Sequence, residues 1–293
     1  MIVAIFGLEI KNQYMPVVNQ LFQLMIDYSV GFYVHADFAL KLEGKCPPMS
    51  SKLDTFRFES DLPSDVEFLI TIGGDGTVLK SCMYMQSKTL PIIGVNTGHL
   101  GFLSAISTNE LALAFDMLLA KQYTIEERVL LEFHEEQQKF GNYNYALNEV
   151  TVTKMDTSSM IKIHTYVDGE YLTSYWADGL IISTPTGSTA YSLSVGGPIL
   201  PPGAQNFVIT PICPHNLSMR PIVIPSSSKI ELRIEGRGNQ FLSSLDSRSE
   251  AIDFPGLIKI EQANFKVKTI KLDGRSFFDT LRNKLMWGSS MRS

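Results

Sequence analysis

The sequence predicts an α/β plus all-β protein: an open, mostly parallel α/β N-terminal domain, a β-sandwich-like C-terminal domain, and a C-terminal helix that packs back on the first domain. Strand-like and helix-like segments alternate over the first 120 residues. Short segments rich in Val, Ile, Thr and Tyr follow, separated by turns. One amphipathic segment ends the chain. We therefore expect domains at residues 1–122 and 123–273, and a returning helix at 274–293.

The first domain is predicted from buried apolar runs and helical spacings. The clearest central strand is the apolar run at 68–72. Further strands are expected at 1–8, 31–38 and 91–95, and helices at 12–29, 77 to about 86, and 109–121. This βαβ rhythm predicts parallel strands with helices on both faces of the sheet.

The second domain is predicted from a run of short strand-like segments. These lie at 124–134, 142–154, 161–167, 171–183, 207–212, 229–235, 241–245, 257–262 and 266–272. The last helix can be capped by Ser276, with Asp279 three residues on. Its apolar face needs a partner, and we expect that partner to be the first domain.

Composition and charge exclude several classes of protein. Hydrophobic residues make up 44% and charged residues 19%, as in globular proteins. A net charge of -5 argues against nucleic-acid or anionic-membrane binding, which need a basic face. Cys46, Cys82 and Cys213 are far apart and form no CxxC pair, so we expect free thiols, no zinc site and a reducing compartment. Neither a signal peptide nor an apolar run long enough for a membrane helix is present, so we expect a cytoplasmic protein.

A glycine-rich turn follows the central strand and precedes a helix. It reads Gly73-Gly74-Asp75-Gly76-Thr77, with Lys80 about one turn further on. Glycines let the backbone curl and direct its amides at one point, and a helix N-terminus favours an anion, so this turn suits a phosphate. Asp75 would repel that phosphate unless it holds Mg²⁺ or accepts a proton from an attacking hydroxyl. Thr77 can cap the helix. The alternative to a phosphate site is a plain strand-to-helix turn in which Asp75 is the cap.

A second loop follows the buried strand that starts after Asp178. Thr184 to Ser192 carries five Ser and Thr hydroxyls and one glycine. Hydroxyls and free amides can bind ribose, an adenine edge or a phosphate without adding charge. The alternative is a polar loop with a helix cap.

A smaller signal lies at Asn148-Glu149. Tyr143, Tyr145 and Leu147 occupy odd positions, whereas Val150 continues the apolar pattern at even ones. A slip of one residue predicts a bulge or break in the strand, which is common beside active sites. Asn148 could then bind an adenine edge and Glu149 a ribose hydroxyl. A polar loop end is the alternative.

Together, Gly73-Gly74-Asp75-Gly76-Thr77, Asn148-Glu149 and the run from Asp178 to Ser194 resemble the three signatures of the NAD kinase family in order and spacing. The first turn is shared with diacylglycerol and sphingosine kinases. Those lipid kinases usually continue it with an acidic helix, whereas Val78-Leu79-Lys80-Ser81 follows here. The long run Thr184 to Ser192 is more specific to the NAD kinases.

The resemblance implies a role for each matching residue. Asp75 would be the general base, and Gly76 would lie against the dinucleotide. The other turn residues, Gly73, Gly74, Thr77 and Lys80, are candidates for binding the nucleotide phosphates because of their place at the helix N-terminus. Asn148 and Glu149 would contact the adenosine part of NAD. The NAD pocket would be lined by Asp178, Thr186, Thr189, Ala190, Tyr191, Ser192, Leu193 and Ser194. Asp246 matches a position near the phosphate-accepting end of the pocket. Arg248 stands where the family often has glutamine, which puts its contact in doubt.

The implied reaction transfers the γ-phosphoryl group of ATP to the 2′-hydroxyl of the adenosine ribose of NAD, giving NADP. The resemblance further implies a divalent metal (Mg²⁺ or Mn²⁺) carried with ATP, and a homodimer or homotetramer with the active site near a subunit interface. The alternatives are a kinase of the diacylglycerol or sphingosine type and a non-catalytic NADP-binding sensor. The sequence leaves open whether polyphosphate replaces ATP and whether NADH is accepted.

Overall fold

The computed structural model of the 293-residue chain describes residues 1–45, 53–84, 90–98, 101–104, 106–155 and 159–286. It divides into two compact units. Unit 1 comprises Met1–Glu127 and Val267–Ser293, and unit 2 comprises Arg128–Lys266.

Unit 1 is an α/β layer built on five parallel strands. In the order of the sheet these are β5 (Ile92–Val95), β4 (Phe68–Ile72), β1 (Ile2–Gly7), β2 (Gly31–His35) and β3 (Thr55–Phe56). The helices are α1 (Met15–Asp27), α2 (Ala36–Leu42), α3 (Asp75–Cys82), α4 (Leu111–Leu119) and α6 (Phe277–Leu285). Short 3-10 turns lie at Asn12–Tyr14, Glu59–Asp61 and Thr108–Glu110.

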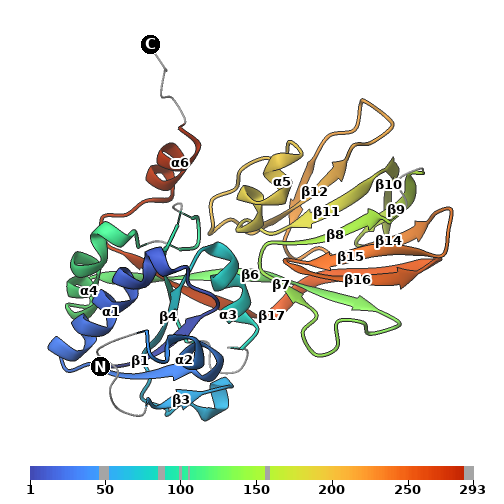
Figure 1. Cartoon of the computed structure of the whole chain (residues 1–293). Helices are drawn as coiled ribbons and strands as arrows, with labels where there is room; N and C mark the ends of the chain where they lie inside the picture. Colours follow the sequence, from blue (N-terminus) through green and yellow to red (C-terminus); the bar gives the residue numbers. More distant parts are fainter. Residues whose placement is uncertain (46–52, 85–89, 99–100, 105, 156–158, 287–293) are drawn as a thin grey trace. The chain divides into compact units, whose positions relative to one another are not determined.

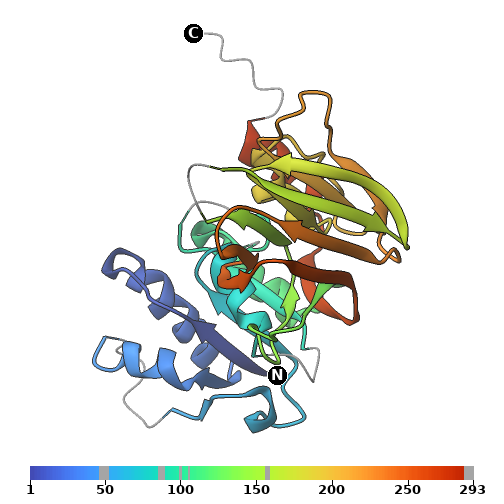
Figure 2. The ribbon, with the colours of Figure 1, turned by 90° about the vertical axis from the view of Figure 1, so that its right-hand side faces the viewer.

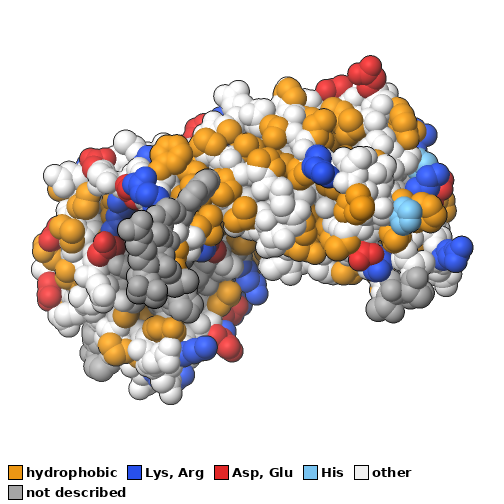
Figure 3. All heavy atoms as spheres, turned by 90° about the horizontal axis from the view of Figure 1, so that it is seen from above, with side chains coloured by type: hydrophobic (Ala, Val, Ile, Leu, Met, Phe, Trp, Pro, Cys, Tyr) orange, Lys and Arg blue, Asp and Glu red, His pale blue; other side chains and the backbone are white. Residues whose placement is uncertain are grey.

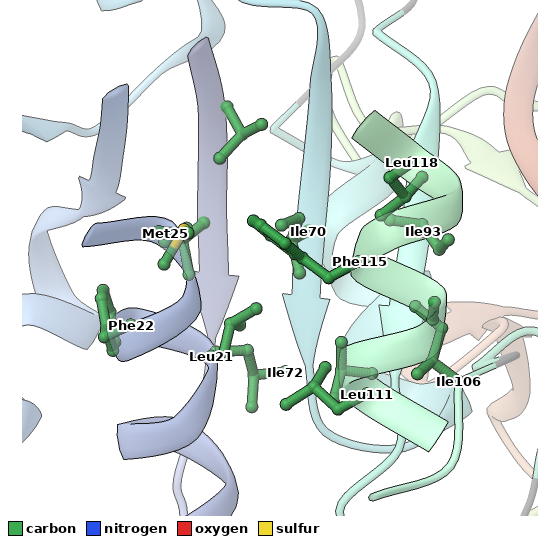
Figure 4. Close-up of a cluster of buried hydrophobic side chains, with 14 of the residues drawn as sticks. Leu21, Phe22, Met25, Ile70, Ile72, Ile93, Ile106, Leu111, Phe115 and Leu118 are labelled. Atoms are coloured by element: carbon green, nitrogen blue, oxygen red, sulfur yellow. The ribbon is translucent and has the colours of Figure 1, made fainter. Parts of the chain in front are cut away.

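The core of unit 1 forms where α1 and α4 pack on one face of this sheet (Figure 4). Leu21 and Met25 of α1 lie four residues apart, so both point to the strands, and Phe115 of α4 meets Ile70. The connection from β1 to β2 runs one way across the sheet and that from β4 to β5 runs the other way. Right-handed crossovers therefore place α3 on the face opposite α1 (Figure 1).

The predicted bounds of several elements of unit 1 differ from those in the structure. The strand expected at 31–38 ends at His35, and α2 begins at Ala36, because Phe38 and Leu42 are buried together at helical spacing. α1 starts at Met15 after a 3-10 turn, with Pro16 in its first turn. α3 starts at Asp75 and ends at Cys82; the predicted end near residue 86 lies outside the described residues.

Unit 2 consists of two antiparallel sheets packed face to face (Figures 1 and 2). One has the order β13 (Ile222–Pro225), β12 (Asn206–Ile212), β11 (Gly179–Ser183), β8 (Glu149–Lys154), β15 (Gln240–Leu245) and β16 (Arg248–Asp253). The other contains β10 (Glu170–Ala177), β9 (Ile161–Val167), β14 (Ile230–Glu235) and β17 (Gly256–Leu272), with β6 (Tyr123–Glu135) and β7 (Tyr145–Ala146) beside it. Buried side chains of both sheets, such as Phe207 and Leu232, share one core, which confirms the sandwich-like prediction.

Two strands of unit 2 were not predicted, and two predicted strands are one. β13 and β16 have few buried side chains, so their apolar pattern is weak. Residues 257–262 and 266–272 belong to the single strand β17. Because β6 and β17 each have residues in both units, the units divide at 127/128 and 266/267, whereas the predicted domains divide at 122/123 and 273/274.

Helix α6 returns to unit 1, as the sequence predicts. The Asp279 N–H donates to Ser276 Oγ at 3.1 Å, so Ser276 is the N-cap. Leu281 is buried, and the Phe277 ring lies 6.2 Å from the Phe102 ring of unit 1. These contacts bury Leu281 and part of Phe277, whereas Phe278 and Leu285 of the same helix are exposed.

The surface carries mixed charges. In the face shown in Figure 3, acidic and basic side chains are interspersed among uncharged ones. Over the described ranges, no helix has the length and apolar character needed to cross a bilayer.

Candidate active site

The glycine-rich turn lies at the point where the strand order of unit 1 reverses. It joins the carboxyl end of β4 to α3, and β4 is the neighbour of β1. Open α/β sheets bind ligands at such a switch point. Gly73 has a positive φ of 151°, and a Cβ at this residue would lie 2.1 Å from Thr77 Oγ1. Only glycine fits this position, and the turn brings the N-terminus of α3 to the strand end.

Asp75 is the first residue of α3, and its carboxylate is held by a loop of unit 1. Oδ1 accepts hydrogen bonds from the N–H groups of Leu103 and Ser104 at 3.0 and 2.9 Å and from Ser104 Oγ at 2.9 Å. Oδ2 accepts one from the Phe102 N–H at 2.8 Å. A Cβ at Gly101 would lie 1.8 Å from Oδ1, so the loop fits closely around the carboxylate.

These contacts contradict the capping alternative. The N-cap of α3 is Gly74, and among the described residues no side chain caps this helix. Thr77 lies inside α3, with its N–H bonded to the Gly74 carbonyl, so its expected role as cap is wrong. The Asp75 side chain remains 29% exposed, which leaves part of the carboxylate within reach of a ligand.

The lysine close to the Asp75 carboxylate is Lys284, whereas the sequence pointed to Lys80. Lys80 is exposed on α3. It lies five residues after Asp75, so its side chain leaves the helix at about 140° from that of Asp75. Lys284 of α6 places its Nζ 3.8 Å from Asp75 Oδ2. Local sequence gave no signal for Lys284, because it lies 209 positions later; only the predicted return of the last helix could have directed attention to it.

In unit 2, the break predicted at Asn148-Glu149 is confirmed. β7 ends at Ala146 and pairs with β6 in one sheet. β8 begins at Glu149 and pairs with β11 and β15 in the other sheet. The apolar phase slips because the chain passes from one sheet to the other at Leu147 and Asn148.

Asp246 holds this crossing in place. It lies in the two-residue turn between β15 and β16, with a positive φ of 53°, which Asp tolerates better than most residues. Its carboxylate accepts hydrogen bonds from the N–H groups of Leu147, Asn148 and Glu149 at 2.9, 2.8 and 3.1 Å. The fold thus brings Asp246 next to Asn148 and Glu149, although about 100 positions separate them in the sequence.

The hydroxyl-rich loop joins the same cluster. The Thr184 N–H donates to the Asn148 carbonyl at 2.9 Å, and the Thr184 hydroxyl donates to the Leu147 carbonyl. A Cβ at Gly187 would lie 2.0 Å from the Asn148 carbonyl oxygen, so only glycine permits this approach. Asn148-Glu149, the Thr184 loop and Asp246 therefore form one cluster, which we call the unit 2 cluster.

Most hydroxyls of the loop stabilise the loop itself. Ser188 Oγ donates to the Pro185 carbonyl at 2.6 Å and accepts from the Leu200 N–H at 2.9 Å. Ser192 is buried, with its hydroxyl 3.0 Å from Thr210 Oγ1, and Thr186 is also buried. Thr189, Ala190 and Leu193 are partly exposed, and Tyr191 and Ser194 are exposed. The loop is thus rigidly preorganised, and its accessible residues lie between 189 and 194.

Two buried carboxyl groups meet in the unit 2 cluster. Burial, together with the nearby Asp246 carboxylate, raises the pKa of Glu149 from its ordinary 4.5 to about 8. Burial also raises the pKa of Asp246, but the three N–H donors favour its charged form. The negative charge therefore resides on Asp246, and Glu149 carries a proton at neutral pH. Glu149 Oε2 is buried and has no hydrogen-bond partner among the described residues.

Asp178 lies outside this arrangement, whereas Arg248 borders it, and its positive charge opposes the rise in the pKa of Asp246. Asp178 Oδ1 pairs with Lys154 Nζ at 2.6 Å, at the opposite end of β11 from Glu149. Five strand residues separate those ends, which corresponds to about 16 Å. Arg248 donates from its guanidinium to the carbonyls of Tyr143 and Tyr145, so it ties β16 to the approach of β7.

Comparison with known proteins gives the same family for both units. Residues 3–123 match the model of the ATP-NAD kinase N-terminal domain, and residues 147–272 match that of the ATP-NAD kinase C-terminal domain. An NAD kinase of Flavobacterium johnsoniae is 42% identical over 293 residues, covering 99% of each chain. An NAD kinase of Cytophaga hutchinsonii is 41% identical over the whole of both chains.

Solved structures agree. The crystal structure of a yeast NADH kinase complexed with NADH matches with a TM-score of 0.86 and 27% identity, covering 100% of this chain and 89% of that one. An NAD kinase from Archaeoglobus fulgidus, solved in complex with ATP, shares the fold with a TM-score of 0.75 at 24% identity, covering 98% of this chain and 99% of that one. The matched domains and full-length relatives leave one conclusion: this chain belongs to the NAD kinase family.

Proposed function

We propose that this protein transfers the γ-phosphoryl group of ATP to the 2′-hydroxyl of the adenosine ribose of NAD, producing NADP. The observation that carries this proposal is the Asp75 carboxylate, fixed at the N-terminus of α3 by three backbone N–H groups and still partly exposed. A hydroxyl that receives a phosphoryl group must lose its proton, and a fixed, accessible carboxylate beside a phosphate-binding turn can accept that proton.

Asp75 acts as general base in this reaction. It orients the 2′-hydroxyl and accepts its proton as the bond to phosphorus forms. Phosphoryl transfer passes through a loose transition state, so positioning and charge neutralisation account for most of the rate. The turn residues Gly73, Gly74 and Gly76 present backbone N–H groups to phosphate oxygens without side chains in the way.

The unit 2 cluster binds the adenosine part of NAD. Asn148 offers both a donor and an acceptor to the adenine edge. Protonated Glu149 can donate a hydrogen bond to a ribose oxygen, which a charged carboxylate could not do. Asp246 holds the backbone of both residues, and the accessible residues of the 189–194 segment contact the same nucleotide.

A homo-oligomer with NAD bound near a subunit interface fits the position of Asp178. Within one chain this carboxylate lies about 16 Å along β11 from Glu149, so it is better placed to contact NAD held by a neighbouring subunit. The divalent metal, Mg²⁺ or Mn²⁺, enters with ATP and neutralises its phosphates. The three widely spaced cysteines support a cytoplasmic location, and neither Cys82 nor Cys213 forms a disulfide with another described residue.

One coupled assay separates this proposal from its alternatives. The protein is incubated with ATP, Mg²⁺ and NAD, and an NADP-specific dehydrogenase reports the product, since it requires the phosphate on the 2′-position. Parallel reactions offer diacylglycerol or sphingosine as acceptor, or polyphosphate as donor. Steady NADP formation supports the proposal. Phosphorylation of a lipid alone, or NADP binding with no turnover on any acceptor, would refute it.

A further inference from the structure

The ammonium group of Lys284 stands beside the proposed base. Its Nζ lies 3.8 Å from Asp75 Oδ2 and 4.4 Å from the centre of the Phe102 ring. We infer that Lys284 is a further catalytic residue, whose ammonium contacts the phosphoryl group as it is transferred to the hydroxyl bound at Asp75 Oδ2. This inference rests on the proposed function and names the residue that neutralises charge in the same site.

Helix α6 holds Lys284 in this position. Phe277, Leu281 and Lys284 follow the spacing i, i+4 and i+7, so they share one face of the helix. Phe277 contacts the Phe102 ring, and Leu281 is only 6% exposed. At the start of the helix, Arg275 forms an ion pair with Glu110 at 2.9 Å. The face that carries Lys284 is therefore anchored on unit 1 at several points.

The hydrogen bonds of Asp75 determine which oxygen can act as the base. Oδ1 already accepts from two N–H groups and from the Ser104 hydroxyl. Oδ2 accepts from a single N–H group, that of Phe102. An oxygen of a carboxylate offers about two lone-pair sites, so a substrate hydroxyl must donate to Oδ2. Lys284 faces that same oxygen.

The Lys284 ammonium is close to Oδ2 but not bonded tightly to it. A charge-assisted N–H···O bond is about 2.7–2.9 Å long, and this separation is 3.8 Å. The Phe102 ring attracts the cation without accepting a conventional hydrogen bond. An ammonium has three N–H donors, so Lys284 can bind phosphate oxygens while it stays beside the carboxylate.

The step balances with these groups. The 2′-oxygen of NAD forms a bond to the γ-phosphorus, and the bond from that phosphorus to the β,γ-bridging oxygen breaks, releasing ADP. The hydroxyl proton passes to Asp75 Oδ2. Negative charge spreads over the oxygens of the transferred group, and a fixed cation beside them lowers the barrier.

The competing interpretation is a surface ion pair that only anchors α6. Both side chains are about one-third exposed, and exposed ion pairs contribute little to stability. An anchor and a catalytic cation predict different results: loss of an anchor changes thermal stability, whereas loss of the cation changes turnover with the fold intact.

The test compares K284M, K284Q and K284R with wild type in the coupled NADP assay, and measures the melting temperature of each. R282M is the matched control, because Arg282 is exposed on the same helix and pairs with Asp279. We expect kcat of K284M and K284Q to fall about 10²–10³-fold, the usual effect of removing one fixed transition-state donor. The KM for NAD should change less than about threefold. The kcat of K284R should be at least about tenfold higher than that of K284M, because arginine keeps the positive charge.

Each result decides the question. The inference would be overturned if kcat were unchanged in K284M and K284Q. It would also be overturned if the loss of kcat came with a lowered melting temperature and K284R did not restore it. A large loss of kcat in R282M would also overturn it, since helix packing would then explain the effect. Wild-type protein that forms no NADP would refute the proposed function itself, whereas an active wild type with active K284M refutes only the role of Lys284.

Discussion

Replacing Glu149 with glutamine tests the electrostatics of the unit 2 cluster through the stability of the folded chain. Glutamine has nearly the same shape and no charge, so it mimics the protonated carboxyl group. Glu149 is 8% exposed, lies beside the charged Asp246, and keeps a pKa of about 8 in the folded protein. In the unfolded chain its pKa returns to about 4.5.

The sign of the effect follows from these two values. Between pH 4.5 and 8 the folded chain holds a proton that the unfolded chain has lost, so the Glu149 contribution to stability is full below pH 4.5 and is lost as pH rises through 8. Each unit of pH within that window changes the free energy of unfolding by about 1.4 kcal/mol. From pH 5.5 to 7.5, wild type should therefore lose about 2–3 kcal/mol relative to E149Q.

The assay is urea unfolding of wild type and E149Q, without NAD, at pH 5.5 and 7.5. Taking the difference between the two proteins cancels the titration of all groups that do not interact with Glu149. E250Q, which removes an exposed carboxylate from β16, is the matched control. If wild type and E149Q showed the same change in unfolding free energy between the two pH values, Glu149 would not be held protonated by its surroundings, and the reasoning would be refuted.

Two further substitutions test how the unit 2 cluster is built. G187A should move the Thr184 loop, because its Cβ would lie 2.0 Å from the Asn148 carbonyl oxygen, and we expect the KM for NAD to rise about tenfold or more. G203A is the control, because no described atom lies within 4 Å of a Cβ added at that glycine. An unchanged KM in G187A would contradict the close contact. R248M leaves the carbonyls of Tyr143 and Tyr145 without their guanidinium donor, so the free energy of unfolding should fall by about 2 kcal/mol in urea titrations; no loss of stability would show that these bonds contribute nothing.

Much of the fold follows from local patterns in the sequence. The apolar run at 68–72 and the glycines after it define β4 and its turn without any tertiary information. The slip at Asn148-Glu149 correctly indicated a break because a change of sheet changes which side chains face the core. The strand expected at 31–38 was wrong after His35, since a short apolar run has no feature that separates a buried strand from the start of a buried helix.

The parts that could not be predicted depend on contacts between distant residues. Asp75 is positioned by N–H groups 27 to 29 residues later, and nothing in the turn itself identifies them. Lys80 was expected to serve the phosphate because it is near in sequence, whereas Lys284 is near in space. Ser192 is expected to line the NAD pocket, yet its hydroxyl lies 3.0 Å from Thr210 Oγ1 of β12, a contact that no local pattern in the sequence indicates. Residue type indicated candidate site residues, and packing determines which of their polar groups remain accessible.

The turnover of D75N tests the central claim most directly. Asparagine has nearly the same shape, and its oxygen can accept the bonds from Leu103 and Ser104. Its NH₂ group replaces Oδ2, so it loses the bond from the Phe102 N–H and cannot take a proton. In the coupled NADP assay, with exposed D65N as control, we expect kcat to fall about 10²–10⁴-fold with NAD affinity largely kept. D75N that makes NADP at the wild-type rate would show that Asp75 is not the base.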